Sequence, residues 1–477
     1  MNRPGTLDEV VRLSDTTAFL IFRDSLGRRC AVYVKLEVPA GSGPFPVVIH
    51  CPGGGQTIAE ADLTYWNRHG FACVSFDWQH GLYDHDPRKK SQWPANCIEQ
   101  HGPAVRPEQL MIPLATQAVG VIIDWLGKDR RCNSERIGIT GISWGGYLTW
   151  VANAHEPRLR AAVPVYGCGG LFETGHACRP PVAATALSAW VPDFEPFHLA
   201  SQQKSPVCYL SGTNDFFGWP RHADVLLKQL SVPHRRAYLP NADHAVDPGA
   251  SLLAVAWMKK WLAGGPELPP EPTTGGNWWT CSTGDDDRHC WWPGTAPAWA
   301  TAELFTSRGD DGIYLTSGVE VRSTSAATKL PQLPAIWSDA RAGIGWHWGL
   351  ATTQLHGNEA VSLCSLGHDL TRVTITGNRS DNLGVILRHT ADPRWNTPDF
   401  AGMKIRLDGL TRPCTELRVN YGIQEGNTRR FITHTVPVDE HGWIYLNKPP
   451  APWSLITRID LDGIPGPSFI LGPFARL

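Results

Sequence analysis

Short apolar runs alternate with stretches of helical periodicity over the first half of the chain. The runs at 46–50, 72–77 and 137–142 are mostly apolar, as is typical of parallel strands buried on both faces. Between the last two, residues 108–126 repeat Leu, Ala, Val, Ile and Trp at helical spacing. We expect further strands at 160–167, 206–211 and 235–239, and further helices at 59–70, 221–230 and 252–262. This alternation predicts a doubly wound α/β sheet, opened by a hairpin over 18–34.

Two long segments interrupt the alternation. Residues 78–106 are irregular and rich in Trp, His and Pro, and a loop of that length inside a compact domain is usually functional or disordered. Residues 168–199 follow an expected strand and show no clear periodicity of their own. We interpret this second segment as a cap over the site.

The pattern changes after residue 264. Residues 265–276 are rich in Pro, Gly and Thr, which indicates a linker, and the helical signal is lost beyond it. Short β-rich runs then recur between turn residues, which predicts an all-β, jelly-roll-like sandwich over 277–477. Tryptophans gather at 278–299, where packing against the first domain is a simpler explanation than stacking on sugars. The predicted catalytic domain is therefore 1–264.

A strand-to-helix junction carries the motif G-x-S-x-G at residues 141–145. This arrangement is a nucleophile elbow, in which a serine on a sharp, strained turn projects its Oγ above the sheet at a helix N-terminus. Gly141 and Gly145 lack a Cβ, so the strand and the helix can approach closely. The alternative is a chance match in a chain with 47 glycines, and the flanking strand and helix argue against it. Ser143 is the predicted nucleophile.

A second glycine cluster, Cys-Pro-Gly-Gly-Gly-Gln at 51–56, follows the expected strand 46–50. Acyl transfer needs two N–H donors aimed at the developing oxyanion, and one usually comes from the loop after the third strand. We expect this oxyanion hole to combine the Trp144 amide with an amide of the loop, from these three residues: Gly54, Gly55 and Gln56. The alternatives are a plain glycine turn or a phosphate loop, and the segment lacks the G-K-[ST] that a phosphate loop needs.

A serine nucleophile needs a base and an orienting carboxylate, in the chain order Ser, Asp, His for this type of elbow. Asp215 follows the expected strand 206–211, and His244 follows the expected strand 235–239. Ligands bind at the carboxyl ends of strands in open α/β sheets, so these side chains can converge on Ser143. We therefore predict a Ser143–His244–Asp215 triad. The less favoured histidines and aspartates are His198, His222, His234, Asp193 and Asp243.

Charge, hydropathy and cysteine spacing restrict the kinds of partner and cofactor that we expect. The formal net charge is −2 and no basic run is present, which argues against nucleic acid. We see no signal-like segment and no stretch of about 18 apolar residues, so we expect a cytoplasmic protein without a membrane partner. The 12 cysteines include no C-x-x-C pair, which argues against zinc, and Cys281 and Cys290 would form a disulfide only in an exported protein. Neither a metal nor an organic cofactor is expected.

Residues 18–263 resemble the α/β-hydrolase superfamily, on the branch of dienelactone hydrolases, acetyl xylan esterases and prolyl-oligopeptidase-like enzymes. The resemblance rests on four motifs: Gly-Ile-Ser-Trp-Gly-Gly-Tyr at 141–147, Ala-Val-Pro-Val-Tyr-Gly at 162–167, Gly-Thr-Asn-Asp at 212–215, and Asp-His at 243–244. The β domain resembles the jelly roll of cocaine-esterase-like acyl esterases in its general strand character alone. The chain lacks the N-terminal propeller of prolyl oligopeptidases, which weakens a peptidase interpretation.

These features predict a serine carboxylester hydrolase that forms an acyl-enzyme from a small-molecule ester, with acetylated sugars among the candidate substrates. The expected pocket residues are Tyr166, Trp190 and Phe216. Three other functions stay open: a peptidase or amidase with the same triad, an acyltransferase that excludes water, and a carbohydrate-binding protein with a vestigial hydrolase half. No feature of the sequence indicates an oligomeric state.

Overall fold

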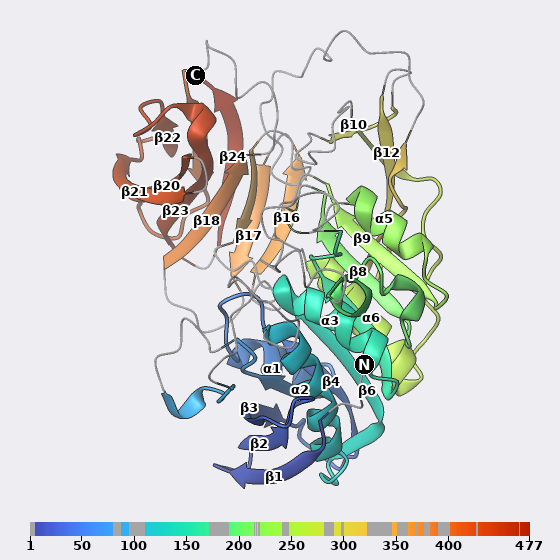
Figure 1. Cartoon of the computed structure of the whole chain (residues 1–477). Helices are drawn as coiled ribbons and strands as arrows, with labels where there is room; N and C mark the ends of the chain where they lie inside the picture. Colours follow the sequence, from blue (N-terminus) through green and yellow to red (C-terminus); the bar gives the residue numbers. More distant parts are fainter. Residues whose placement is uncertain are drawn as a thin grey trace.

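Figure 1 shows the computed structural model of the chain. The structure describes residues 5–79, 87–94, 110–170, 190–213, 215, 217, 220–240, 248–280, 291–296, 300–321, 346–350, 361–367, 370–375, 382–389, 401–425, 428–466 and 468–477. Several predictions fall outside the described residues: those for His244, Phe216, Cys281, Cys290 and residues 171–189 of the cap. Along the chain, a large mixed sheet with helices is followed by a small antiparallel sheet and then by two further antiparallel sheets.

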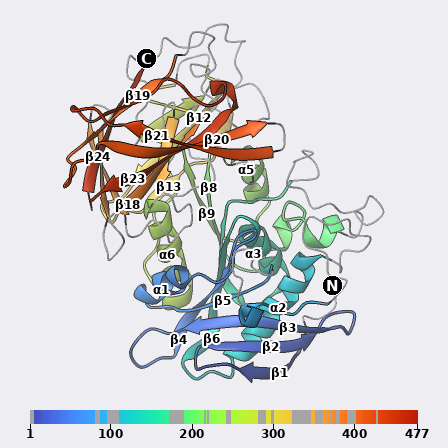
Figure 2. The ribbon, with the colours of Figure 1, turned by 90° about the vertical axis from the view of Figure 1, so that its left-hand side faces the viewer.

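The first part is built on a nine-stranded sheet with strand order β1-β2-β3-β5-β4-β6-β7-β8-β9 (Figures 1 and 2). Its strands are β1 (Leu7–Arg12), β2 (Thr17–Arg23), β3 (Arg29–Glu37), β4 (Phe45–Cys51), β5 (Ala72–Phe76), β6 (Cys132–Ile142), β7 (Leu159–Val165), β8 (Val207–Gly212) and β9 (His234–Leu239). Pairs from β1 to β5 are antiparallel, and pairs from β5 to β9 are parallel. The carboxyl ends of β4, β6, β7 and β8 therefore lie at the same end of the sheet.

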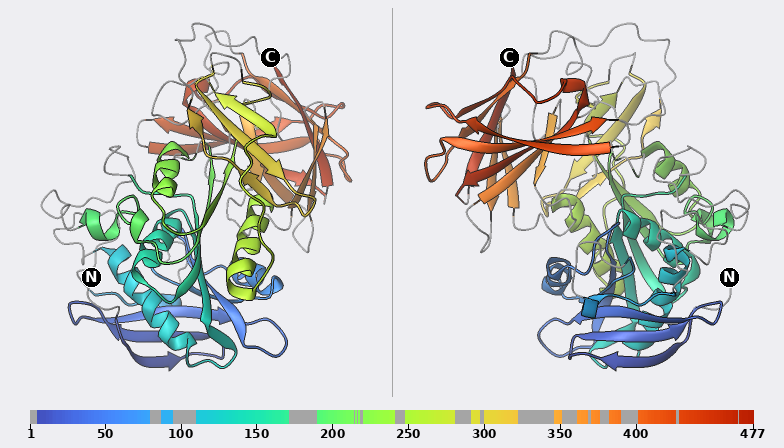
Figure 3. Two further views of the ribbon diagram at one scale, coloured as in Figure 1. Left: turned by 90° about the vertical axis from the view of Figure 1, so that its right-hand side faces the viewer. Right: turned by 60° about the vertical axis from the view of Figure 1, so that its left-hand side comes forward.

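Helices cover both faces of this sheet (Figure 3). They are α1 (Glu60–Arg68), α2 (Met111–Leu126), α3 (Trp144–His155), α5 (Pro220–Lys228) and α6 (Pro248–Ala263), with short 3₁₀ helices η1 (Pro87–Lys89), η3 (Ala200–Gln202) and, much later, η5 (Trp453–Leu455). Side chains of α2, α3 and α5 share one hydrophobic core, and those of α1 and α6 share another. Successive strand residues serve the two cores in turn, since Val47 and Ile49 belong to the first and Val48 to the second. The predicted α/β sheet is confirmed.

Residues 276–321 form a small sheet of their own. Its strands are β10 (Gly276–Thr280), β11 (Trp292–Pro293), β12 (Ala302–Arg308), β13 (Tyr314–Thr316) and β14 (Glu320–Val321). Four of them run in the order β11-β10-β12-β13, and β14 pairs with β12. Trp278 and Trp291 pack in the same core as α2 and α3, which accounts for two of the tryptophans at the predicted junction. Strand pairing thus divides the predicted β domain into two structures, and the domain boundaries themselves stay a prediction.

The small sheet covers β9, the last strand of the large sheet. The Tyr238 amide donates to Thr316 Oγ1 (3.1 Å), and the Val319 amide donates to Asp224 Oδ2 (2.5 Å). Asp224 also forms an ion pair with Arg236 of β9, and both side chains are buried. A sheet edge left bare would offer its polar groups to other chains, and here the small sheet occupies part of it.

Two five-stranded antiparallel sheets complete the chain (Figure 2). One has the order β15-β18-β23-β20-β21, with β15 (Trp346–Leu350), β18 (Asn382–His389), β23 (Ile456–Pro465), β20 (Glu416–Glu425) and β21 (Thr428–Pro437). The other has the order β16-β17-β24-β19-β22, with β16 (Val361–Gly367), β17 (Leu370–Ile375), β24 (Ser468–Arg476), β19 (Met403–Asp408) and β22 (Trp443–Leu446). Both sheets contribute to one core, in which Met403, Ile405 and Leu407 alternate with less buried residues. The all-β prediction is confirmed, and the jelly-roll topology stays a prediction. The described residues contain no helix long and apolar enough to cross a membrane.

We expect the buried contact between Asp224 and Arg236 to stabilise the part of the chain built on the nine-stranded sheet. Asp224→Ala should lower the free energy of unfolding by about 1–3 kcal/mol, because the Val319 amide and the Tyr238 hydroxyl lose a buried acceptor while Arg236 keeps its pair with Glu271. Asp129→Ala is the matched control, since Asp129 pairs with an arginine that is 45% exposed and should lose only about 0–1 kcal/mol. Urea unfolding followed by tryptophan fluorescence measures both losses, and equal losses would contradict the prediction.

Candidate active site

Ser143 occupies the turn between β6 and α3 with φ 55° and ψ −121°, a left-handed conformation that serine seldom adopts. Its amide donates to the Val165 carbonyl at the end of β7 (2.9 Å), and its carbonyl accepts the Tyr147 amide (2.9 Å). The first bond ties the turn to the neighbouring strand, and the second begins the helix. Ser143 is half-buried. This strand, turn and helix have the geometry expected of a nucleophile elbow.

Three glycines let the backbones meet at this turn. A Cβ on Gly141 would overlap the Gly145 carbonyl, and a Cβ on Gly145 would overlap the Cys51 carbonyl. A Cβ on Gly146 would overlap the Val165 carbonyl. The ends of β4, β6 and β7 are thereby in contact with the start of α3, and a side chain at any of these positions would displace the serine turn.

The glycine cluster after β4 forms a tight turn that is closed twice. The Gln56 amide donates to the Gly53 carbonyl (3.0 Å), and the Gly53 amide donates to Gln56 Oε1 (3.1 Å). Gly55 has φ 70°, as a turn of this kind requires at its third position. A Cβ on Gly53 would lie 3.2 Å from the Ile142 carbonyl oxygen. The turn therefore lies beside the residue that precedes Ser143.

Residues after β5 hold the glycine turn in place. Trp78 Nε1 donates to the Pro52 carbonyl (2.8 Å), and Gln79 Oε1 accepts the Gly55 amide (2.7 Å). Both side chains are buried, whereas Gly54 at the tip of the turn is exposed. Two of the three loop amides expected to face an oxyanion, those of Gly55 and of the residue after it, thus have acceptors inside the protein.

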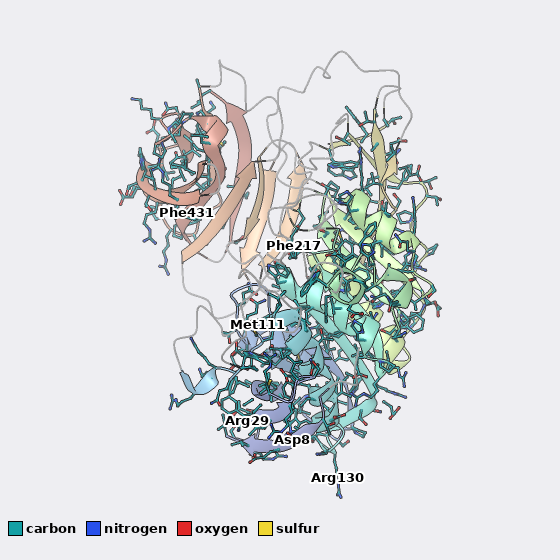
Figure 4. All side chains as sticks on the ribbon, in the orientation of Figure 1. Asp8, Arg29, Met111, Arg130, Phe217 and Phe431 are labelled. Carbon is teal, nitrogen blue, oxygen red and sulfur yellow. The ribbon has the colours of Figure 1, made fainter. Side chains whose placement is uncertain are left out.

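Asp215 follows β8 and is fully buried. Its Oδ1 accepts the Phe217 amide (2.7 Å). The Phe217 ring, labelled in Figure 4, packs against Trp144 with ring centroids 4.9 Å apart. The segment that carries the predicted triad aspartate is therefore in contact with the residue next to Ser143. The predicted base, His244, lies outside the described residues.

Two of the three predicted pocket residues are described, and both are buried. Tyr166 follows β7 with φ 60°, and its amide donates to the Leu210 carbonyl (2.7 Å). Within the described ranges, Tyr166 and Ser143 are the two non-glycine residues with positive φ, and they follow neighbouring strands. Trp190 packs against Phe194 with ring centroids 5.1 Å apart. Their contact with substrate stays a prediction.

Two buried acids near the elbow are absent from the sequence predictions. Glu195 accepts hydrogen bonds from Tyr147 Oη (2.9 Å) and from the Gly170 amide (2.5 Å). Asp62 of α1 faces His50 of β4, with Oδ2 3.7 Å from Nε2. No local pattern marks either acid, because the partners come from other elements. Among the residues that the structure describes, no three His, Cys, Asp or Glu side chains are grouped so as to hold a metal ion.

His50 lies at the end of β4, just before the glycine turn. Burial lowers its pKa, and the neighbouring Asp62 acts in the opposite direction. Burial likewise raises the pKa of Asp62, and His50 opposes that shift. His50 Nδ1 also lies 3.3 Å from Ser75 Oγ of β5. Burial therefore favours the neutral imidazole, which belongs to a buried polar cluster behind the turn.

Comparison with known proteins relates this site to hydrolases. Residues 111–217, which include Ser143 and Asp215, match the model of the X-Pro dipeptidyl-peptidase family (S15 family). A Salmonella typhimurium protein provisionally named carboxymethylenebutenolidase is 29% identical over 116 residues, which cover 24% of this chain and 37% of that protein. The fold is that of the α/β-hydrolases. The resemblance predicted from the sequence motifs is thereby confirmed, for a hydrolase fold with esterase-like and peptidase-like relatives.

Two solved structures are also similar to part of this chain. Acetyl xylan esterase 1 from Thermoanaerobacterium sp. JW/SL YS485 is 16% identical, over 55% of this chain and 89% of that chain, with a TM-score of 0.42. Dipeptidyl peptidase 4 from Porphyromonas gingivalis is 15% identical, over 52% of this chain and 35% of that chain, with a TM-score of 0.39. At such identities and scores, neither structure bears on the substrate of this protein.

We expect the acid stability of this protein to depend on His50. Because burial lowers its pKa in the folded chain, the unfolded chain binds a proton near pH 6.5 that the folded chain binds only at lower pH. Stability is therefore full above that pH and declines as the pH falls toward the folded pKa. His50→Asn removes this titration, so its free energy of unfolding should fall less between pH 7 and pH 5 than that of the wild type.

Urea titrations at the two pH values measure this difference. His441→Asn is the control, because His441 is exposed and its replacement should leave the pH dependence as it is. The prediction is wrong if His50→Asn loses as much stability on acidification as the wild type does.

Proposed function

We propose that this protein is a serine carboxylester hydrolase that acts through a Ser143–His244–Asp215 triad. The observation that carries the proposal is the left-handed turn at Ser143, because a strained serine between a strand and a helix presents its Oγ for attack. Asp215 supports it, since a buried carboxylate whose loop packs against the elbow suits the role of orienting a histidine. We include His244 in the proposed triad because it follows β9 in the sequence.

In the proposed reaction, His244 takes the proton of Ser143 as Oγ attacks the ester carbonyl, and a tetrahedral oxyanion forms. Asp215 orients the imidazole and stabilises the imidazolium. The imidazolium then protonates the leaving alcohol as the C–O bond breaks, which leaves an acyl-enzyme. Water, deprotonated by the same imidazole, attacks the acyl group, and the carboxylic acid leaves as Ser143 regains its proton.

We assign the oxyanion donors to Trp144 and to the glycine turn. Trp144 is the first residue of α3, where backbone amides and the helix dipole favour negative charge. Of the three candidate amides in the turn, that of Gln56 closes the turn and that of Gly55 donates to Gln79. Gly54, at the exposed tip, is therefore the donor that we favour from the turn.

A peptidase or amidase is the second candidate, because the matching family model is that of X-Pro dipeptidyl-peptidases. Both reactions use the same triad and differ in how strongly the leaving group must be protonated. A carbohydrate-binding protein with a vestigial hydrolase half would have no use for the strain at Ser143, which costs about 1–3 kcal/mol. We favour an ester of a small molecule, with acetylated sugars among the candidates.

Loss of the nucleophile should remove the activity without changing the fold. We expect Ser143→Ala to lower turnover of p-nitrophenyl acetate by about 10³-fold or more, and His244→Ala to cause a similar loss. An organophosphonate should add mass to the Ser143 peptide of the wild type. Ser134→Ala is the control, because Ser134 is also half-buried and lies on β6, the strand that leads into the serine turn. Activity retained in Ser143→Ala, with labelling elsewhere, would contradict the proposal.

A matched pair of substrates separates the two candidate activities. We expect hydrolysis of p-nitrophenyl acetate and of acetylated xylo-oligosaccharides, and much slower hydrolysis of p-nitroacetanilide and of alanyl-proline p-nitroanilide. Each kcat/KM should be measured beside Ser143→Ala, which reports the turnover that does not depend on the triad. A kcat/KM for alanyl-proline p-nitroanilide above those of the esters would favour the peptidase.

A further inference from the structure

We propose that Glu195 is a positioning residue for acyl transfer: through Tyr147 it holds the serine turn and the aspartate loop in their mutual arrangement. This inference rests on the proposed function, since it concerns the same Ser143 and Asp215. Glu195 is a fully buried acid to which the proposed reaction gives no chemical step. An ionised or protonated carboxyl group is costly to bury unless its oxygens are hydrogen-bonded, so its partners indicate why it is there.

Both oxygens of Glu195 are hydrogen-bonded to elements of the site. Oε2 accepts the Tyr147 hydroxyl (2.9 Å), and Oε1 accepts the Gly170 amide (2.5 Å). Gly170 belongs to the glycine-rich turn after β7, where its φ is 74° and that of Gly169 is 82°. A Cβ on Gly169 would overlap Oε1 of the carboxylate. Glu195 thus joins the segment 190–199 to α3 and to the end of β7.

Tyr147 connects this carboxylate to the predicted triad. Its amide donates to the Ser143 carbonyl (2.9 Å), so Tyr147 lies in the first turn of α3. Its ring lies 5.3 Å from Trp144 and 6.5 Å from Phe217, between ring centroids. The Phe217 amide in turn donates to Asp215 Oδ1 (2.7 Å). Tyr147, Trp144 and Phe217 therefore form an aromatic cluster beside the elbow. Phe217 belongs to the segment that carries Asp215, and Glu195 fixes the hydroxyl of Tyr147 at the edge of the cluster.

The contact has a functional consequence because triad chemistry is sensitive to small displacements. A shift of about 1 Å between reacting groups can cost about 100-fold in rate. Without the Glu195 acceptor, the buried Tyr147 hydroxyl loses this hydrogen bond, and its ring, which packs against both Trp144 and Phe217, is free to shift. A displacement there would change kcat more than KM, because it affects the reacting groups rather than a surface that binds substrate.

The experiment compares Glu195→Ala, Glu195→Gln and Tyr147→Phe with the wild type in the full chain. Each variant is first checked for folding by circular dichroism and thermal unfolding. We then measure kcat and KM for p-nitrophenyl acetate and the rate at which an organophosphonate labels Ser143. We expect kcat and the labelling rate to fall together by about 10- to 100-fold in Glu195→Ala and Tyr147→Phe, at nearly constant KM. Glu195→Gln should keep most of the activity, because its carbonyl can accept the Gly170 amide while its NH₂ donates to the Tyr147 hydroxyl.

Glu156→Gln is the matched control. Glu156 is also a buried acid, but it caps the far end of α3 and pairs with Arg158. We expect it to lose thermal stability and to label at the wild-type rate. Because Glu195 and Tyr147 act through one hydrogen bond, the double variant Glu195→Ala/Tyr147→Phe should be no slower than the slower single variant.

Wild-type labelling rates in folded Glu195→Ala and Tyr147→Phe would overturn the inference, as would losses that multiply in the double variant. Should Glu195→Ala fail to fold, Tyr147→Phe alone still decides, since it keeps the carboxylate and removes only its partner. A failure of the proposed function is recognised separately: wild-type protein would then leave Ser143 unlabelled, or Ser143→Ala would retain activity.

Discussion

At Gly145 the first turn of α3 lies so close to the Cys51 carbonyl that a Cβ atom has no space. The same crowding at Gly141 and Gly146 fixes the helix against the ends of β6 and β7. Ser143 stands between them in a left-handed conformation that costs about 1–3 kcal/mol. The turn cannot relax on its own, because its amide is bonded to Val165 and its carbonyl is bonded into the helix. The buried sheet behind the turn, through these contacts, thus keeps Ser143 in its strained conformation at the carboxyl end of the strands.

Two buried acids, Asp215 and Glu195, contact the segments around the serine turn at this end of the sheet. Each of the two accepts a backbone amide from a segment that follows a strand. Asp215 receives the Phe217 amide after β8, and Glu195 receives the Gly170 amide after β7. A buried carboxylate restricts its neighbours, because moving it away from its donors exposes the full cost of its desolvation. These acids therefore act as fixed points around the serine turn, whichever of them takes part in the chemistry.

Local sequence signals predicted much of this arrangement. The elbow motif, the apolar strands and the glycine turn each depend on residues within a short stretch, and Asp215 could be proposed because it follows a strand. Contacts between distant segments were not predictable in this way. Glu195 is hydrogen-bonded to Tyr147 of α3, which is distant in the sequence. The positive φ of Tyr166 was not predictable either, because the residue is neither a glycine nor an asparagine. For the glycine turn, the sequence suggested three possible oxyanion donors. The structure shows that two of their amides are hydrogen-bonded inside the protein, one to the Gly53 carbonyl and one to Gln79, which follows β5.

The second half of the chain divides into a small sheet and two later sheets, and the small sheet contacts the first half directly. Its strand β13 contacts both β9 and α6, and Tyr314 and Leu315 belong to the core that α6 helps to form. Trp291 and Val319, which adjoin strands of the small sheet, belong to the core of α2 and α3. β9 and α6 are the elements that flank His244 in the sequence, so the small sheet supports both ends of the segment that carries the predicted base. The two later sheets have a core of their own. Residues of the small sheet therefore share cores with the nine-stranded sheet, although they follow the linker where the helical pattern ends.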